Sequence, residues 1–192
     1  MGALDHSLPD DGMSGPLARV PAAQRRTLLR SISAATVLLF VAITLLGLPL
    51  RTDAAPLGIV SLQFAASPDA ARRMLDSWSA VSRARLLWAH GLDLILPVAY
   101  ALAIGLAAQR AAGRARAIRR AAAVASGAAV AAALADQVEN VAMGLTILAG
   151  PIWPGVLVTL VAAMMKSALL LLAIGALVVA SIGARDTRSA GG

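Results

Sequence analysis

The chain has 192 residues, of which 59% are hydrophobic and only 14% are charged. A soluble domain of this size would be about one quarter charged and less than half apolar. The composition therefore excludes an ordinary globular protein, a disordered chain and a basic nucleic-acid-binding domain, in spite of a formal net charge of +7. Because the chain contains no cysteine, it also excludes a disulfide framework, a thiol nucleophile and a cysteine-ligated metal.

Four apolar stretches are long enough to cross the hydrocarbon core of a bilayer, which takes about 20 helical residues. They cover residues 32–50, 86–109, 121–148 and 155–183. The sequence therefore predicts an all-α polytopic membrane protein with four transmembrane helices. The first stretch is followed by Arg51, Thr52 and Asp53, which is a poor context for signal-peptide cleavage. We interpret it as a retained anchor.

The distribution of basic residues predicts the orientation of the chain. Eleven of them lie in the N-terminal segment, the second loop and the C-terminal tail, against five in the first loop. The positive-inside rule then puts both termini in the cytoplasm. The abundance of arginine and alanine suggests a GC-rich bacterial genome. We therefore expect the protein in the inner (plasma) membrane of a bacterium. The expected partners are the lipid bilayer and a second copy or another membrane subunit, and no nucleic acid.

The two ends of the chain are predicted to lie outside the membrane domain, which covers residues 31–183. Residues 1–30 mix glycine, proline, aspartate and arginine without a sustained period, which is typical of a disordered tail. Residues 184–192 are predicted to form a second cytoplasmic tail. The connections after the second and third spans are short, so the last three helices should be consecutive antiparallel neighbours.

The first loop is predicted to contain an extracytoplasmic amphipathic helix over residues 68–82. Ser67, Pro68 and Asp69 are an N-cap residue, a first-turn proline and a first-turn acid. Apolar side chains then follow at helical spacing, namely Met74, Leu75, Trp78 and Val81. Such a helix would lie in the outer headgroup plane with Trp78 as an anchor. It is interpreted either as a lid over a site between the spans or as a surface helix that covers the bundle end.

Seven polar side chains in the last three spans lie at spacings that place them on shared helix faces. They are His90, Asp93 and Tyr100 in the second span, Asp136, Glu139 and Asn140 in the third, and Lys166, the only lysine, in the fourth. At a rise of 1.5 Å per residue, the acids and the lysine lie about 10 to 18 Å below the outer ends of their spans. We therefore predict one polar site that opens toward the outer face.

The charges of this site do not balance. Three acids against one lysine leave an excess of two negative charges inside the spans. Each isolated charge costs about 2.5 to 3.5 kcal/mol in the bilayer core, so we expect Lys166 to pair with Asp136 or Glu139. At least one acid should be neutral at neutral pH unless a cation binds. Pro97 also leaves a backbone carbonyl one turn back, near Asp93, without its helical donor.

At these residues the chain resembles a group of small four-span bacterial membrane proteins of unassigned function. Their pattern has S/T-P-x-x-A-x-x-x-L-x-x-W in an extracytoplasmic helix, L-D-x-x-x-P/F-x-x-Y and D-x-x-E-N in the next two spans, and a lysine in the fourth. The matching residues are Ser67, Pro68, Ala71, Leu75, Trp78, Leu92, Asp93, Pro97, Tyr100, Asp136, Glu139, Asn140 and Lys166. The resemblance covers residues 30–180. It implies that the intramembrane residues act as one unit, and it implies no reaction.

Three functions are compatible with such a site. The first is a proton- or cation-linked transport module, which with four helices would require an oligomer. The second is an intramembrane enzyme acting on a lipid or isoprenoid, with the acids as general acid and base. The third is an accessory or assembly subunit whose polar layer only joins the helices. In an intramembrane enzyme His90, Asp93, Asp136 and Glu139 could hold a metal, but the sequence has no recurring metal spacing such as H-x-x-x-H. No metal site is therefore predicted, and the sequence identifies no cofactor.

Overall fold

The computed structural model describes residues 22–112 and 115–189, and no β-strand occurs within these ranges. Four helical stretches are long and apolar enough to cross a membrane. They are Gln24–Leu50, Ala80–Ala111, Arg116–Ala149 and Trp153–Arg185. The prediction of an all-α polytopic membrane protein with four crossings is confirmed.

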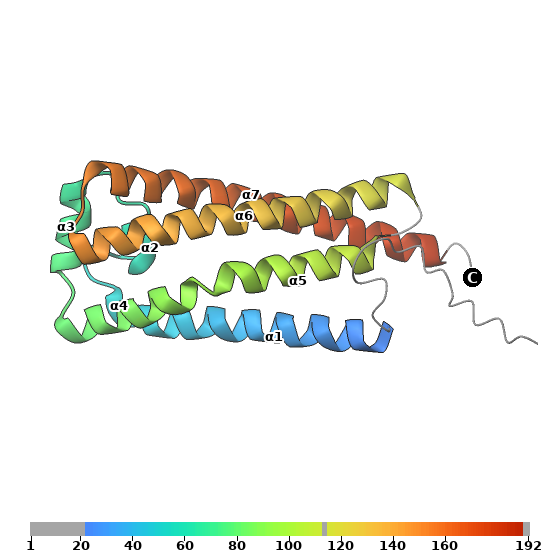
Figure 1. The fold of residues 1–192 in the computed structure, drawn as a ribbon, viewed down its shortest axis with the longest axis horizontal. Helices are drawn as coiled ribbons and strands as arrows, with labels where there is room; N and C mark the ends of the chain where they lie inside the picture. The colour runs from blue at the N-terminus through green and yellow to red at the C-terminus, as the bar shows by residue number, and fades with distance from the viewer. Residues whose placement is uncertain (1–21, 113–114, 190–192) are drawn as a thin grey trace, which may run out of the picture.

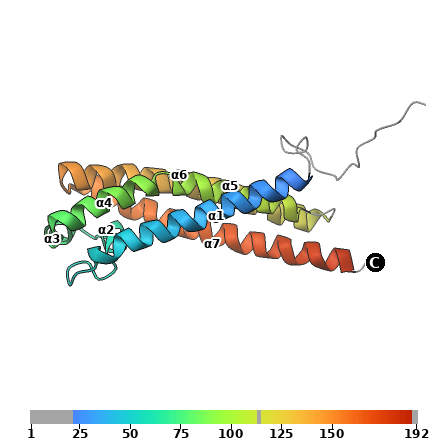
Figure 2. The ribbon, with the colours of Figure 1, turned by 90° about the horizontal axis from the view of Figure 1, so that it is seen from below.

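The four crossings form a bundle in which neighbours in sequence are neighbours in space. The helices are α1 (Ala22–Gly47), the 3-10 helix η2 (Leu48–Leu50), α2 (Ile59–Gln63), α3 (Pro68–Asp76), α4 (Ala80–Asp93), α5 (Leu96–Ala111), α6 (Arg116–Ala149) and α7 (Trp153–Ser189). α6 packs along α5 and α7, as predicted for antiparallel neighbours, and α4 and α5 lie end to end as one crossing (Figure 1). α1 crosses obliquely over α4 and α5 (Figure 2).

The helices are longer than the apolar stretches that predicted them. α1 begins at Ala22, so residues 22–30 are helical rather than disordered, and residues 1–21 lie outside the described part of the chain. α7 continues to Ser189, through most of the segment predicted as a tail. Apolar windows mark only the hydrocarbon layer, whereas a helix keeps its backbone bonds beyond it while arginine side chains reach water.

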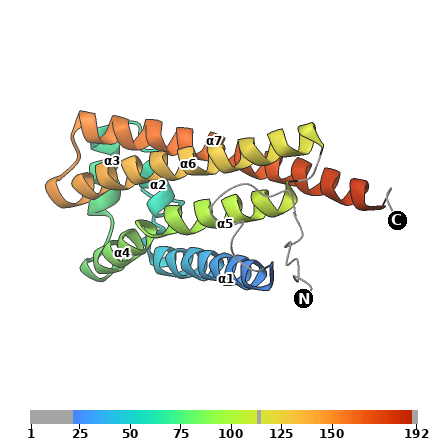
Figure 3. The same cartoon turned by 45° about the vertical axis from the view of Figure 1, so that its right-hand side comes forward.

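Residues 48–79, here named the cap, close one end of the bundle. They hold η2, which contacts α1 and α4, and the short helices α2 and α3, which lie beside the end of α7 (Figure 3). α3 begins as predicted, because the Ser67 hydroxyl accepts a hydrogen bond of 3.1 Å from the backbone N–H of Ala70. Ala71 on its inner face is fully buried. The sequence pattern allows this helix to be either a lid over a site or a surface helix that covers the bundle end. The position of α3 fits the second interpretation.

The predicted single helix over residues 68–82 is wrong. α3 ends at Asp76, and α4 begins at Ala80 after a short turn. The two serines of that turn are the reason: Ser77 donates to the carbonyl of Met74 at 2.7 Å, and Ser79 caps α4 by accepting from the N–H of Ser82 at 3.2 Å. Serine side chains compete in this way with a continuous helix and favour its ends.

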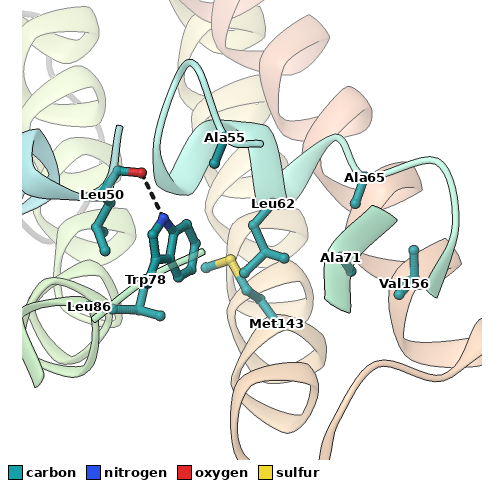
Figure 4. Packing of buried hydrophobic residues seen from close by; sticks show 9 residues of the cluster. All are labelled: Leu50, Ala55, Leu62, Ala65, Ala71, Trp78, Leu86, Met143 and Val156. Atoms are coloured by element: carbon teal, nitrogen blue, oxygen red, sulfur yellow. Dashed lines mark hydrogen bonds between the residues drawn. The ribbon is translucent and has the colours of Figure 1, made fainter. Parts of the chain in front are cut away.

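The turn also changes the place of Trp78, which is not a membrane anchor. Its side chain is only 3% exposed, and its indole Nε1 donates a hydrogen bond of 2.7 Å to the carbonyl of Leu50 (Figure 4). Val81, predicted on the same apolar face, is exposed. Trp88 and Trp153 are exposed instead, and they have the amphipathic character of interfacial tryptophans.

Candidate functional site

The second crossing is interrupted beside the polar site. α4 ends at Asp93, and α5 begins at Leu96 with Pro97 in its first turn. Because Pro97 has no N–H, the carbonyl of Asp93 lacks its helical donor. The side chain of Asn140 on α6 supplies one, with Nδ2 3.0 Å from the Asp93 carbonyl oxygen. The predicted orphan carbonyl is confirmed, and Asn140 is its partner.

A second amide side chain of α6 holds the same interruption. Gln137 Nε2 donates a hydrogen bond of 2.7 Å to the carbonyl of Leu94. Gln137 is a site residue that the sequence pattern did not predict. The available signal was its spacing, because it lies one turn before Asn140 on the helix and both bear amide donors. Two side chains of α6 thus satisfy two consecutive carbonyls of the break.

Lys166 on α7 lies between two carboxylates of α6. Its Nζ is 3.0 Å from Asp136 Oδ1 and 2.8 Å from Glu139 Oε2. Asp136 and Glu139 are one turn apart, so a single ammonium group on the neighbouring helix reaches both. The side chain of Lys166 is 15% exposed, and those of Asp136 and Glu139 are 4% and 0% exposed. The expected pairing of Lys166 is confirmed with both acids.

The two carboxylates differ in what they contact. Asp136 uses both oxygens, because the Tyr100 hydroxyl donates to Oδ2 at 3.2 Å while Oδ1 accepts from Lys166. Glu139 Oε2 forms an ion pair with the ammonium group, but neither buried oxygen of Glu139 has a hydrogen-bond partner, and Oε1 has no ion pair either. A buried acceptor without a donor is unfavourable. Glu139 therefore has an open position for a donor or a proton.

Asp93 and His90 lie on the α4 side of this group. Asp93 is buried, and its carboxylate is within electrostatic range of Asp136 and Lys166. His90 packs against α6 at Gly144, where an added Cβ would lie 3.0 Å from its Nε2. His90 Nδ1 is buried without a hydrogen-bond partner, as is Asn140 Oδ1. All seven predicted residues thus gather in one layer, with His90 at its edge toward the cap.

The site is built around the lysine ammonium group. Within the described ranges, no three side chains of histidine, aspartate or glutamate lie close enough to hold a metal ion. The position between Asp136 and Glu139, where a cation would be attracted, is occupied by Lys166 Nζ. What this arrangement can exchange most directly is a proton.

Apolar side chains cover the polar site on the side of the cap, where the sequence predicts an opening. Leu86 lies one turn from His90, and Met143 one turn from Glu139 and Asn140, and both are fully buried. Trp78 packs against them from the cap (Figure 4). Bulky side chains of the cap reach the bundle end because the turn after Asp76 directs them inward.

An apolar groove lies elsewhere on the bundle, between α6 and α7 near the cap end. It has a volume of about 640 Å³ and is lined mainly by aliphatic side chains such as Val138, Val141, Leu145 and Val158. Gln137 is at its edge. Neither the three acids nor Lys166 is among its described lining residues, so the groove and the polar site are separate.

No protein-family model, curated protein or solved structure matches the chain. The resemblance to small four-span bacterial membrane proteins stays a prediction.

Proposed function

We propose that the protein is a proton-linked transport module of the membrane, in which Glu139 takes up and releases a proton beside Lys166. The observation that supports this most is the unequal environment of the Glu139 carboxylate. Oε2 forms an ion pair at 2.8 Å with Lys166 Nζ, whereas Oε1 has no charged partner, and neither buried oxygen has a hydrogen-bond partner. A proton on Oε1 would remove the cost of a buried charged acceptor that has no donor.

The charge balance supports a proton as the exchanged species. The three buried acids and Lys166 carry a formal excess of two negative charges. A proton on Glu139 reduces this excess and weakens the attraction of Glu139 for the ammonium group, which then belongs to Asp136 alone. Ionised Glu139 draws Lys166 back to the shared position. The site therefore has two arrangements that differ by one proton.

The interrupted second crossing supports a link between this proton and the backbone. Discontinuous helices at mid-membrane depth are typical of ion and substrate sites in transporters. Here Asn140, the neighbour of Glu139 in sequence, donates to the Asp93 carbonyl at the break. A shift of α6 after protonation of Glu139 would thus act directly on the end of α4.

The wider setting is part of the proposal. We place the protein in a bacterial inner membrane with both termini in the cytoplasm, because most arginines lie on that side. Four helices are few for a complete transport path, so the module would act as a homo-oligomer or with another membrane subunit. The exposed aliphatic side chains on its crossings would face lipid or these partners.

The alternative of an intramembrane enzyme acting on a lipid or isoprenoid has weaker support. The apolar groove that would suit such a chain is lined by Val141 and Leu145 but not by the acids. The other alternative, an accessory subunit with a purely structural polar layer, makes the same ion pairs and differs in having no proton flux. The experiment below separates it from transport.

Proton flux in vesicles tests the proposal. The purified protein is reconstituted in phosphatidylethanolamine–phosphatidylglycerol vesicles with a trapped pH-sensitive dye, and a potassium gradient with valinomycin sets the membrane potential. We expect flux with the native chain and at least a tenfold loss in Glu139→Gln. Asp53→Asn is the matched control, because Asp53 is exposed in the cap. Equal flux in the native chain and Glu139→Gln, or no flux in either, would overturn the proposal.

A further inference from the structure

The polar site is separated from the cap end of the bundle by two apolar layers. Leu86 and Met143, each one helical turn from the site, form the first layer and are fully buried. Leu62 and Trp78 of the cap pack against them and form the second (Figure 4). A proton can reach Glu139 from this end only if these side chains move, since a dry apolar constriction excludes water.

The cap is held closed by a few identifiable contacts. Trp78 Nε1 donates to the Leu50 carbonyl at 2.7 Å, across most of the cap's length in sequence. The hydroxyls of Thr52 and Ser77 are 2.8 Å apart and join its two ends. Both contacts connect the start of the cap with its last residues, so breaking them separates the two segments of chain that lead into it.

The cap has little stability of its own. Its helices α2 and α3 have five and nine residues, and isolated helices of fewer than about 12 residues are marginal in water. Their positions depend on the side chains packed against the bundle, above all Leu62, Ala71 and Trp78. The cap is therefore the part of this end that can leave without disturbing the crossings.

The opposite side of the polar site has no comparable movable element among the described residues. There α6 and α7 meet through Ala129 and Ala173, which pack in one cluster and are fully buried. Small side chains bring the backbones of membrane helices close together over a long contact. Opening that side requires separating whole crossings, whereas opening the cap end requires moving one connection.

We infer that the cap is a gate over the polar site and that the Trp78–Leu50 hydrogen bond is its latch. The inference rests on the proposed function, since it names what regulates access of protons to Glu139. In the closed arrangement seen here, Trp78, Leu86 and Met143 block the path. In the open arrangement, release of Trp78 from Leu50 separates the two ends of the cap, so that Trp78 moves away from Leu86 and Met143 and water reaches His90 and Glu139.

A reversible crosslink tests the gate. The chain has no cysteine, so a Thr52→Cys/Ser77→Cys variant carries only the two introduced thiols. Their parent hydroxyls are 2.8 Å apart, so the two introduced thiols lie next to each other where the ends of the cap meet. Copper phenanthroline closes the bond in the vesicles described above, and a thiol reductant reopens it. Each single variant, given the same treatment, controls for effects of the oxidant.

The expected result is that the oxidised double variant loses at least nine tenths of its proton flux and regains it on reduction. Undiminished flux in the oxidised double variant, with the disulfide verified by mass spectrometry, would overturn the gate. If the native chain itself carries no flux, the proposed function fails, and the labelling experiment that follows decides the gate alone.

Thiol labelling measures opening without any transport. In a Met143→Cys variant, a membrane-impermeant maleimide reaches the thiol only when the cap opens, because position 143 is fully buried. Trp78→Phe keeps an aromatic ring but removes the donor to Leu50. It should raise the labelling rate by about tenfold, the effect of losing one buried hydrogen bond. Val81→Cys on exposed α4 controls for reagent access and should react equally fast in both backgrounds.

The two outcomes of the labelling experiment are distinct. The gate is supported if Met143→Cys is labelled slowly, if Trp78→Phe accelerates this labelling, and if the labelling of Val81→Cys does not change. This holds whether or not protons are transported. Equal labelling rates with Trp and with Phe at position 78 would overturn the role of the latch, and complete protection in both would show that the cap does not open.

Discussion

Lys166 Nζ lies 2.8 Å from Glu139 Oε2 in the middle of the α6–α7 pair, and it is also 3.0 Å from Asp136 Oδ1. One ammonium group thus pairs with two carboxylates that have almost no exposure of their own. Since a buried charge without a partner is strongly unfavourable, this relationship is both structural and chemical. It joins α6 to α7, and it leaves the ionisation of Glu139 dependent on where the lysine is.

Removal of the lysine should destabilise the bundle. Lys166→Met leaves Asp136 and Glu139 without a counter-charge and should cost about 3 to 5 kcal/mol, the usual effect of breaking a buried pair. Thermal unfolding in detergent measures the loss. Met164→Leu, at an exposed position of the same helix, should leave the melting temperature unchanged.

The stability lost in Lys166→Met should be smaller when the charge of Glu139 is removed as well. In Lys166→Met/Glu139→Gln the amide introduced at position 139 is neutral, and only Asp136 remains as an uncompensated acid of the pair. We expect a melting temperature above that of Lys166→Met. A double variant no more stable than Lys166→Met would show that Glu139 is already neutral in this state and does not pair with Lys166 as a carboxylate.

The contribution to stability of the hydrogen bond that Asn140 donates at the helix break can be measured with a compensating substitution at Pro97. Asn140→Leu removes the donor to the Asp93 carbonyl and should cost about 1 to 3 kcal/mol. Pro97→Ala supplies a backbone N–H that can reach the same carbonyl. A double-mutant cycle on unfolding free energies should show that Pro97→Ala offsets part of the Asn140→Leu loss. Strict additivity would mean that the carbonyl is satisfied in another way.

The contact of His90 with α6 predicts that a single methyl group added at Gly144 lowers the stability of the protein. An added Cβ at Gly144 would lie 3.0 Å from His90 Nε2, so Gly144→Ala should displace the imidazole and cost about 1 to 3 kcal/mol. Thermal unfolding in detergent measures this cost, and the loss should shrink in a His90→Ala background.

Gly127→Ala is the matched control on the same helix, because an added Cβ there meets nothing within 4 Å. It should be neutral or stabilising by up to about 1 kcal/mol, since alanine has the higher helix propensity. If Gly144→Ala were as well tolerated as Gly127→Ala, His90 would not lie where the structure places it.

The membrane fold was predictable because it depends on length and polarity alone. A bilayer accepts only helices with paired backbones, so four long apolar stretches were sufficient to predict four crossings. The layer of polar residues was predictable for the same reason, since a charge inside a span must face a partner. A pairing of Lys166 with Asp136 or Glu139 followed from helical spacing, and the structure shows that the lysine pairs with both.

The cap and the details of the site depend on interactions that a helical pattern does not contain. Ser77 and Ser79 end one helix and begin the next through side-chain hydrogen bonds, which the apolar spacing of residues 68–82 masks. The burial of Trp78 follows from that turn. The donor role of Gln137 and the unpartnered Oε1 of Glu139 depend on how the second crossing breaks and how α6 and α7 dock, so they need the three-dimensional structure.

The most direct test of the central claim is to observe the proton on Glu139. Infrared difference spectra of the protein in lipid, recorded while the pH is changed, report carboxylic-acid groups that gain or lose a proton. We predict a carboxylic-acid band that appears as the pH falls, is absent in Glu139→Gln and is retained in Asp53→Asn. A band that persists unchanged in Glu139→Gln, or a native spectrum in which no buried carboxyl group titrates, would contradict the proposal that Glu139 exchanges a proton beside Lys166.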